Sequence, residues 1–102
     1  MGISSKFIEH EKKLTIILGD RFDFSCHSEF RDAYCSLDPS QLEITIDFAK
    51  TEYIDSAALG MLLVLRERAG GDGAKIILRS CRPSVQQIMD ITHLDRLFKF
   101  SN

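Results

Sequence analysis

The stretch LEITIDFAKTEYIDSAALGMLLVLRERAGGDGAKIIL, residues 42–78, decides the fold of this chain. Its opening alternates strictly between apolar and polar side chains, which predicts a strand with one buried face, formed by Leu42, Ile44, Ile46 and Phe48. Small and straight-chain residues at 57–69 predict a helix, which the glycine-rich turn at 70–73 ends. The run after this turn predicts a second short strand, with Ile76 and Leu78 in the core.

The segments on either side continue this alternation of strands and helices. Lys6–Lys12 and Leu14–Leu18 predict a first hairpin or two successive strands. Apolar residues at helical spacing predict a helix over about Ser25–Leu37, with a face formed by Phe30, Ala33, Tyr34 and Leu37. A further helix is predicted over about Ser84–Ile91, and the apolar tail at 94–100 is expected to dock on the core after a short closing helix.

This order of elements predicts a single α/β domain over residues 1–102. Strands joined by helical crossovers form parallel pairs, whereas the first two strands are joined by a short turn. We therefore expect a mixed sheet of about four to five strands, covered by about four helices.

Composition and charge exclude several classes of protein. Thirteen basic and 15 acidic side chains give a net charge of −2, without the basic excess typical of nucleic-acid binding, so no nucleic-acid partner is expected. No apolar run reaches the length of a membrane span, so no direct membrane insertion is expected. The start of the sequence lacks the apolar core of a signal peptide. Three cysteines, an odd number without a secretory signal, then predict reduced thiols and a cytoplasmic protein.

Sequence motifs for catalysis, cofactor binding or metal binding are absent. There is no phosphate-binding glycine loop, no G-x-S-x-G nucleophile motif, no H-E-x-x-H and no C-x-x-C. Cys26 and His27 are adjacent, and neighbouring residues face different ways on a helix or strand. We therefore expect no catalytic residue, no cofactor and no metal, and we do not expect an enzyme.

Asp55 and Ser56, at the start of the central helix, are the strongest candidates for a functional site. Either residue is a good N-cap, and one cap suffices to stabilise a helix start by about 1 kcal/mol. The residues after them, 57–64, are apolar without interruption, although a helix packed on one face of a sheet needs polar residues on its other side. We therefore expect part of this apolar surface to face solvent or a partner, with the Ser56 hydroxyl beside it and within reach of a modifying enzyme.

These features resemble a known family. The strand, the short connection, the Asp-Ser pair and the apolar helix look like the core of a STAS domain, the fold of bacterial anti-sigma-factor antagonists. The usual motif of that family is D-S-[ST]-G-[LI]-[GA], which DSAALG at 55–60 resembles. The segment LTIILGDRFDFSCHSEFR, residues 14–31, is similar to the family's first G-x-[LF]-D loop, and the likeness extends from about residue 14 to residue 100.

The resemblance implies a function. In that family a partner anti-sigma factor with serine protein kinase activity phosphorylates the serine of the motif, and a PP2C-type phosphatase removes the phosphate. The corresponding residues are Ser56 as the phosphorylated residue, Asp55 as its acidic neighbour and Asp23 as the aspartate of the first loop. Two positions depart from the family's pattern: Ala58 replaces the usual glycine of the motif, and Asp20 stands at the usual glycine position of the first loop.

Three interpretations follow. The first is a phosphorylation-switched regulator of transcription, which binds and sequesters its partner when Ser56 is bare, through a surface expected to comprise Asp23, Asp55, Ala57, Leu59, Gly60 and Leu63. The second is a constitutive STAS subunit of a lipid-transport ABC complex. Such subunits often carry threonine at the motif serine, so Ser56 favours the first interpretation. The third is a small enzyme or phosphocarrier that uses cysteine or histidine, for which the sequence has no suitable arrangement.

Overall fold

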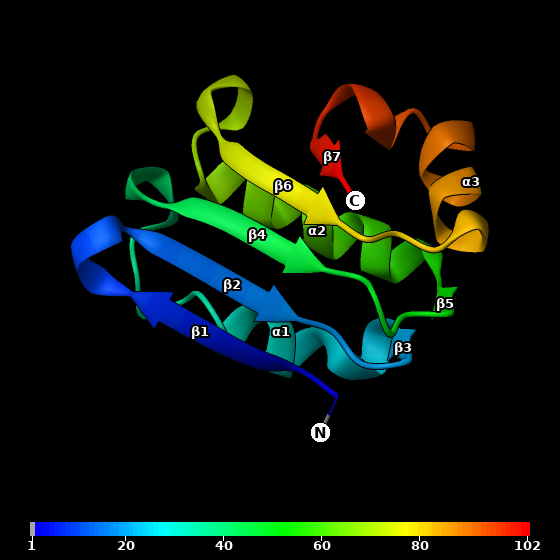
Figure 1. The fold of residues 1–102 in the computed structure, drawn as a ribbon, viewed down its shortest axis with the longest axis horizontal. Helices are drawn as coiled ribbons and strands as arrows, with labels where there is room; N and C mark the ends of the chain where they lie inside the picture. Colours follow the sequence, from blue (N-terminus) through cyan, green and yellow to red (C-terminus); the bar gives the residue numbers. More distant parts are fainter. Residues whose placement is uncertain (1) are drawn as a thin grey trace.

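Parallel strand pairs make up most of the central sheet. The computed structural model describes residues 2–102, in which this sheet has five strands in the order β1-β2-β4-β6-β7 (Figure 1). The strands are β1 (Ser4–Ile8), β2 (Lys13–Ile17), β4 (Glu43–Asp47), β6 (Lys75–Arg79) and β7 (Lys99–Ser101). β1 is antiparallel to β2, and all other neighbours are parallel. The predicted α/β fold with a mixed sheet is confirmed.

Three α-helices occur within residues 2–102: α1 (His27–Asp32), α2 (Ser56–Arg68) and α3 (Pro83–Ile91). Short 3-10 turns account for the rest of the helical residues: η1 (Glu9–Glu11), η2 (Phe24–Cys26), η3 (Pro39–Gln41), η4 (Gly71–Gly73) and η5 (Leu94–Arg96). The predicted closing helix is the single turn η5. The expected number of about four helices is therefore reached only when this turn is included.

α1 is shorter than the helix predicted over Ser25–Leu37. The chain enters it through the 3-10 turn η2. Beyond Asp32 it tightens, because the backbone N–H of Tyr34 donates to the Arg31 carbonyl and that of Leu37 donates to the Tyr34 carbonyl, each three residues back. The apolar face is nevertheless kept, with Phe30 and Tyr34 buried.

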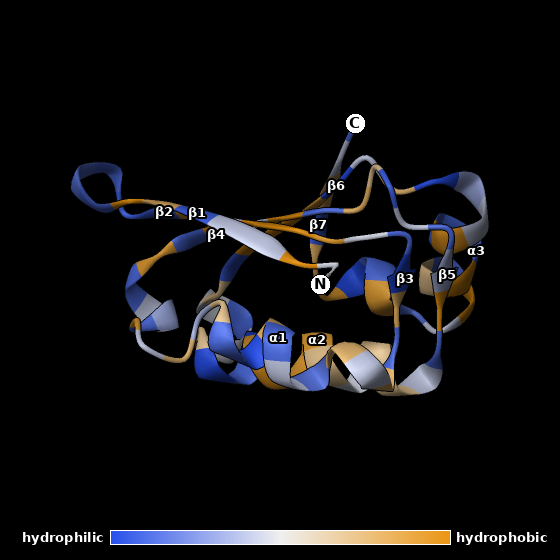
Figure 2. Cartoon of the chain, turned by 90° about the horizontal axis from the view of Figure 1, so that it is seen from below, coloured by the Kyte–Doolittle hydropathy of each residue, from blue (hydrophilic) through white to orange (hydrophobic). Residues whose placement is uncertain are grey.

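Two helices, α1 and α2, cover one face of the sheet, and the opposite face carries neither of them. Figure 2 shows these two helices side by side beneath the sheet, whereas α3 lies beside its end. The predicted strand register is confirmed, because the apolar positions all lie in the core between sheet and helices: Leu42, Ile44, Ile46, Phe48, Ile76 and Leu78. Glu43 is exposed and Thr45 is half-buried on the uncovered face.

A second, two-stranded sheet positions the start of α2. Its strands β3 (Arg21–Phe22) and β5 (Tyr53–Ile54) are parallel. Phe22 and Ile54 are buried, and the Arg21 guanidinium lies 4.4 Å from the centre of the Tyr53 ring. The sequence predicted a loop and a connection here, because strands of two residues are too short to show any alternation. This small sheet brings the loop after β3 against the first turn of α2.

The C-terminal tail docks on the core, as expected, and also adds a strand. Leu94 and Phe98 are buried, and β7 pairs in parallel with β6 through Leu78 and Phe100. None of the helices in residues 2–102 is both long and apolar enough to cross a membrane.

Candidate functional site

Asp55 is the N-cap of α2. Its backbone is extended, with φ −120° and ψ 179°, and its carboxylate accepts a 2.9 Å hydrogen bond from the backbone N–H of Ala58. This bond satisfies one of the N–H groups that a helix start leaves without a partner. The side chain is half-buried. Asp55 is therefore the cap, although the sequence made both Asp55 and Ser56 suitable for this role.

Ser56 is the first residue of α2 and is exposed. Within residues 2–102, its hydroxyl forms no hydrogen bond. Because Asp55 already caps the helix, the Ser56 hydroxyl has no structural task at this position. A free, exposed hydroxyl at a helix N-terminus is open to a modifying enzyme, and the positive end of the helix dipole favours a phosphate placed there.

Asp23 stabilises the turn before α1. Its carboxylate accepts hydrogen bonds from the Ser25 backbone N–H at 3.0 Å and from the Ser25 hydroxyl, and the Arg21 guanidinium lies 3.3 Å away. The hydrogen bond from the Ser25 hydroxyl is the main cause that holds the pKa of Asp23 below its ordinary value. With 14% of its side chain exposed, Asp23 contributes to the shape of the site more than to its accessible surface.

The turn at Asp23 and the start of α2 are joined by a hydrogen bond. The second oxygen of the Asp55 carboxylate accepts from the backbone N–H of Phe24 at 3.4 Å. The Phe24 side chain projects outward with 67% exposure and stacks on the His27 ring, with 5.7 Å between ring centres. Phe24 could not be predicted from the sequence, because a single aromatic residue in a loop belongs to no periodic pattern.

The apolar run after Ser56 divides between core and surface. Its core members are Ala58, Met61 and Leu62, and its outward members are Leu63 and Val64, at 38% and 53% exposure. Ala57 and Leu59 are half-buried, and Leu59 packs against the core. The expected exposed apolar surface therefore exists, with Leu63 rather than Leu59 as its main predicted member. Val64, which was not among the predicted surface residues, is more exposed than either.

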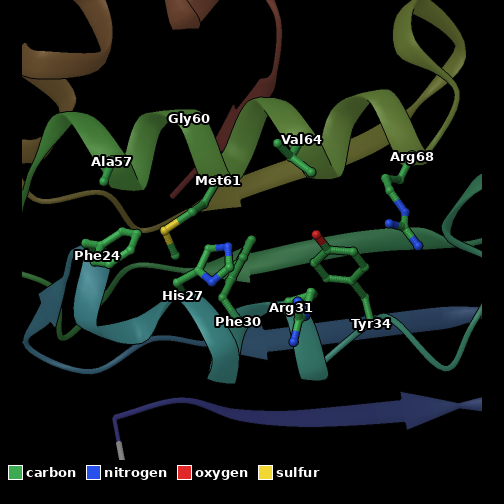
Figure 3. Close-up of a pocket in the computed structure, with 10 residues that line it drawn as sticks. All are labelled: Phe24, His27, Phe30, Arg31, Tyr34, Ala57, Gly60, Met61, Val64 and Arg68. Carbon is green, nitrogen blue, oxygen red and sulfur yellow. The ribbon is translucent and has the colours of Figure 1, made fainter.

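A groove runs between α1 and α2 (Figure 3). It has a volume of about 330 Å³ and is lined mainly by apolar side chains, namely Phe24, Phe30, Tyr34, Ala57, Met61 and Val64, with Gly60. In Figure 3 the side chains of Met61 and Val64 point from α2 toward those of Phe24 and Tyr34 on the opposite wall. The sequence did not predict this groove, because its two walls come from separate segments of the chain.

Cationic side chains occupy one end of this groove. Arg31 on the α1 side and Arg68 on α2 both line it beside Tyr34. Burial raises the pKa of the Tyr34 phenol, and the positive charges of Arg68 and Arg31 oppose that shift. In the part of the chain that the structure describes, neither arginine side chain forms a salt bridge or a hydrogen bond.

Gly60 lies on the exposed face of α2, in the wall of the groove. A Cβ added there would meet no atom of residues 2–102 within 4 Å, so none of these residues requires a glycine at this position. A glycine inside a helix destabilises it by about 0.5–1 kcal/mol relative to alanine. Gly60, one of the predicted surface residues, therefore lowers the stability of α2, and the packing of residues 2–102 gives no reason for a glycine there.

Comparison with known proteins establishes the family. The family model described as "Mlab, STAS domain" matches residues 6–99. The chain belongs to the STAS-domain family. A STAS-domain containing protein of Pseudomonas aeruginosa (strain UCBPP-PA14) is 44% identical over 90 residues, which are 88% of this chain and 89% of that protein.

Solved structures show that the STAS fold is shared. SpoIIAA, an anti-sigma factor antagonist, in its unphosphorylated form superposes with a TM-score of 0.80 at 15% identity, over 98% of this chain and 88% of that one. The phosphorylated form of SpoIIAA, a Bacillus cell fate determinant, gives a TM-score of 0.66 at 13% identity, over 98% and 91% of the two chains.

Both departures of this STAS domain from the family's motifs have structural explanations. The Ala58 methyl group is fully buried, while its N–H donates to Asp55. Asp20 is exposed and contributes through its backbone carbonyl, which accepts from the N–H groups of Glu52 and Tyr53. The glycine lies one position earlier because a Cβ on Gly19 would fall 2.8 Å from the carbonyl oxygen of Gly2.

The surface around Ser56 has features typical of a protein-binding site. Among residues 2–102, no basic group is hydrogen-bonded to the Ser56 hydroxyl, and no three His, Cys, Asp or Glu side chains form a group that could hold a metal ion. The site combines an exposed hydroxyl, two acidic residues, exposed Phe24, Leu63 and Val64, and a groove with a cationic end. Such a surface is suited to binding another protein.

Proposed function

We propose that this STAS domain is a phosphorylation-switched protein-binding regulator of the anti-sigma-factor antagonist type. In its bare form it binds and sequesters a partner regulator through the surface around Ser56, and phosphorylation of Ser56 releases that partner. The proposal is carried by the start of α2, where Asp55 caps the helix and the exposed Ser56 hydroxyl has no hydrogen-bond partner among residues 2–102.

The fold is expected to tolerate the modification. A phosphate on Ser56 adds about −1.5 to −2 charges, which takes the net charge from −2 to about −4. The dipole of α2 favours this charge at its N-terminus by about 0.3–1 kcal/mol. Since the Ser56 side chain is exposed, the phosphate remains hydrated in the free domain, and no buried contact has to be broken.

Phosphorylation of Ser56 is expected to break the complex with the partner. A partner that covers Leu63, Val64 and Ser56 together removes water from the phosphate, beside the carboxylate of Asp55. A charge that is buried without a counterion costs several kcal/mol. A penalty of about 3–4 kcal/mol lowers affinity by a few hundred-fold, enough for an on/off switch without a change of fold.

The partners implied are a serine protein kinase that is also an anti-sigma-type regulator and a PP2C-type phosphatase. Support comes from the shared fold, since SpoIIAA is an anti-sigma factor antagonist known in unphosphorylated and phosphorylated forms. In this proposal the domain acts in the bacterial cytoplasm on transcription, by sequestering a regulator and without catalysing a reaction.

A pull-down from the source cell tests the proposal. Ser56→Ala and Ser56→Asp are used as baits, with Ser84→Asp as a matched control, because Ser84 is another exposed serine in the first turn of a helix, α3. We expect one protein to be captured by wild type, Ser56→Ala and Ser84→Asp and to be lost with Ser56→Asp. Equal capture by all four baits would support the constitutive subunit instead.

A further inference from the structure

The groove between α1 and α2 has dimensions suited to a helix. Along α2 its wall runs from Ala57 to Arg68, a distance of about 16 Å or three helical turns. Ala57, Met61 and Val64 line this wall up to Arg68, the His27 imidazole lies on the opposite wall, and Val64 and Phe24 at the rim are exposed. A groove of this form matches a recurring mode of recognition, in which an amphipathic helix lays its apolar face between two helices.

The charges at the groove's end indicate what the bound helix must carry. Arg31 and Arg68 approach this end from opposite walls, and neither is neutralised by a carboxylate of residues 2–102. Guanidinium groups are well suited to binding carboxylates because they offer several donors in a fixed plane. The complementary ligand is therefore apolar along most of its length and acidic at one end.

Gly60 adds an independent observation. It lies in the same wall, is exposed, and leaves open space where a Cβ would be. A glycine permits another backbone to approach closely, and residues 2–102 supply no such backbone at Gly60. It lies one helical turn from the Ala57 end of this wall, where a helix laid along α2 can approach closely.

We propose that this groove binds an amphipathic helix of a partner protein, with its apolar face on Phe24, Ala57 and Val64, its backbone nearest Gly60, and a carboxylate between Arg31 and Arg68. The inference rests on the proposed function in one respect, since it takes this helix to belong to the regulator that covers Ser56. It adds the class of the binding element and a residue requirement that the Ser56 switch does not specify.

Selection from a peptide library tests the inference without the natural partner. A displayed library of 15-residue helical peptides is selected on the wild-type domain and, in parallel, on Gly60→Trp, which fills the groove from an exposed position. We expect wild type to enrich peptides with apolar residues at i, i+3 or i+4, and i+7 and an acidic residue toward one end. Binding of these peptides to Gly60→Trp should be weaker by about tenfold or more.

A charge reversal provides the second variant. On Arg31→Glu combined with Arg68→Glu, the selected peptides should lose affinity, and repeating the selection should enrich basic residues at the same position. Circular dichroism and thermal unfolding establish that each variant is folded. Failure to enrich any peptide on wild type over Gly60→Trp overturns the inference, as does enrichment that is indifferent to the charge reversal.

Further measurements test whether something other than a partner helix occupies the groove, and whether binding there depends on the Ser56 switch. If sedimentation shows a wild-type dimer that Gly60→Trp dissociates, the groove belongs to a second copy of the chain and the inference is wrong. Laurate serves as a probe for a fatty acid in the groove. The inference is equally wrong if laurate competes with the selected peptides at stoichiometric concentration. Peptides that select the groove but bind Ser56→Asp and wild type alike would support the groove and count against the proposed switch alone.

Discussion

The Asp55 carboxylate accepts a hydrogen bond from the backbone N–H of Phe24, 31 positions earlier in the chain, while its other oxygen caps the helix that it begins. One side chain thus fixes the start of α2 against the turn before α1. This arrangement places Phe24, Ser56 and the mouth of the groove on a single surface. It also relieves Ser56 of the capping role, and the proposed switch depends on that relief.

Replacing Asp55 separates its capping role from its charge. We expect Asp55→Ala to lower the free energy of unfolding by about 1–2 kcal/mol, because both the Ala58 and Phe24 N–H groups lose their acceptor. Asp55→Asn should retain most of the stability, since asparagine is an equally good N-cap. Urea denaturation monitored by circular dichroism measures both values. An Asp55→Ala variant as stable as wild type would show that Ser56 can take over the cap.

The two glycines at positions 60 and 19 should respond oppositely to alanine. Gly60→Ala is expected to raise the free energy of unfolding by about 0.5–1 kcal/mol, because the added methyl group meets nothing. Gly19→Ala serves as the matched comparison and should be destabilising, since its Cβ would fall 2.8 Å from the Gly2 carbonyl oxygen. Thermal unfolding of the pair tests this. Destabilisation by Gly60→Ala would mean that the glycine serves the fold rather than a partner.

Acid should destabilise the domain through Asp47, among other carboxylates. Burial acts to raise the pKa of Asp47, but the hydrogen bond from the Ala49 N–H and the pairing with Arg79 at 2.9 Å outweigh it, so the pKa lies below its ordinary value of 3.8. A carboxyl whose pKa is lowered by folding stabilises the folded state above the unfolded-state pKa and loses that contribution as pH falls below it.

The Asp47→Asn variant isolates this contribution. We expect the stability of wild type to drop between about pH 5 and pH 2, and the drop to be smaller in Asp47→Asn, which cannot titrate at that position. Urea unfolding across this pH range is the measurement. Identical pH profiles for the two proteins would show that Asp47 has the same pKa in the folded and unfolded states.

The exposed apolar residues of α2 should matter for binding and not for folding. Leu63→Glu is expected to lower the affinity for the partner identified by pull-down by about tenfold or more, because a charge would enter the apolar contact. Ile91→Glu is the matched control, since Ile91 is an exposed apolar residue on α3. Surface plasmon resonance on both variants provides the comparison. Equal effects of the two substitutions would remove Leu63 from the proposed interface.

The fold could be predicted from the sequence wherever apolar residues recur with the period of a strand or a helix. The alternation at Leu42–Phe48 predicted both the strand and its buried face, and the small residues after Ser56 predicted α2. The two-residue strands β3 and β5 were missed because pairing between distant segments, and not a local pattern, creates them. The short strand β7 was missed for the same reason.

The candidate site was predicted in part. Ser56, Asp55 and the exposed apolar residues of α2 were identifiable because they lie in one continuous segment. Phe24 and the groove with Arg31 and Arg68 were not, because they depend on how α1 packs beside α2. No local property of Arg31 or Arg68 distinguishes it from an ordinary surface arginine. Their significance comes from sharing one end of an apolar groove.

Calorimetric titration of the partner identified by pull-down tests the central claim most directly. We expect wild type and Ser56→Ala to bind it with equal affinity, and Ser56→Asp to bind at least about tenfold more weakly while remaining folded. Mass spectrometry of the domain purified from its own cells should place phosphate on Ser56. Equal binding by wild type and Ser56→Asp, with phosphate elsewhere or nowhere, would contradict the switch and leave Ser56 as an ordinary residue of the first helical turn.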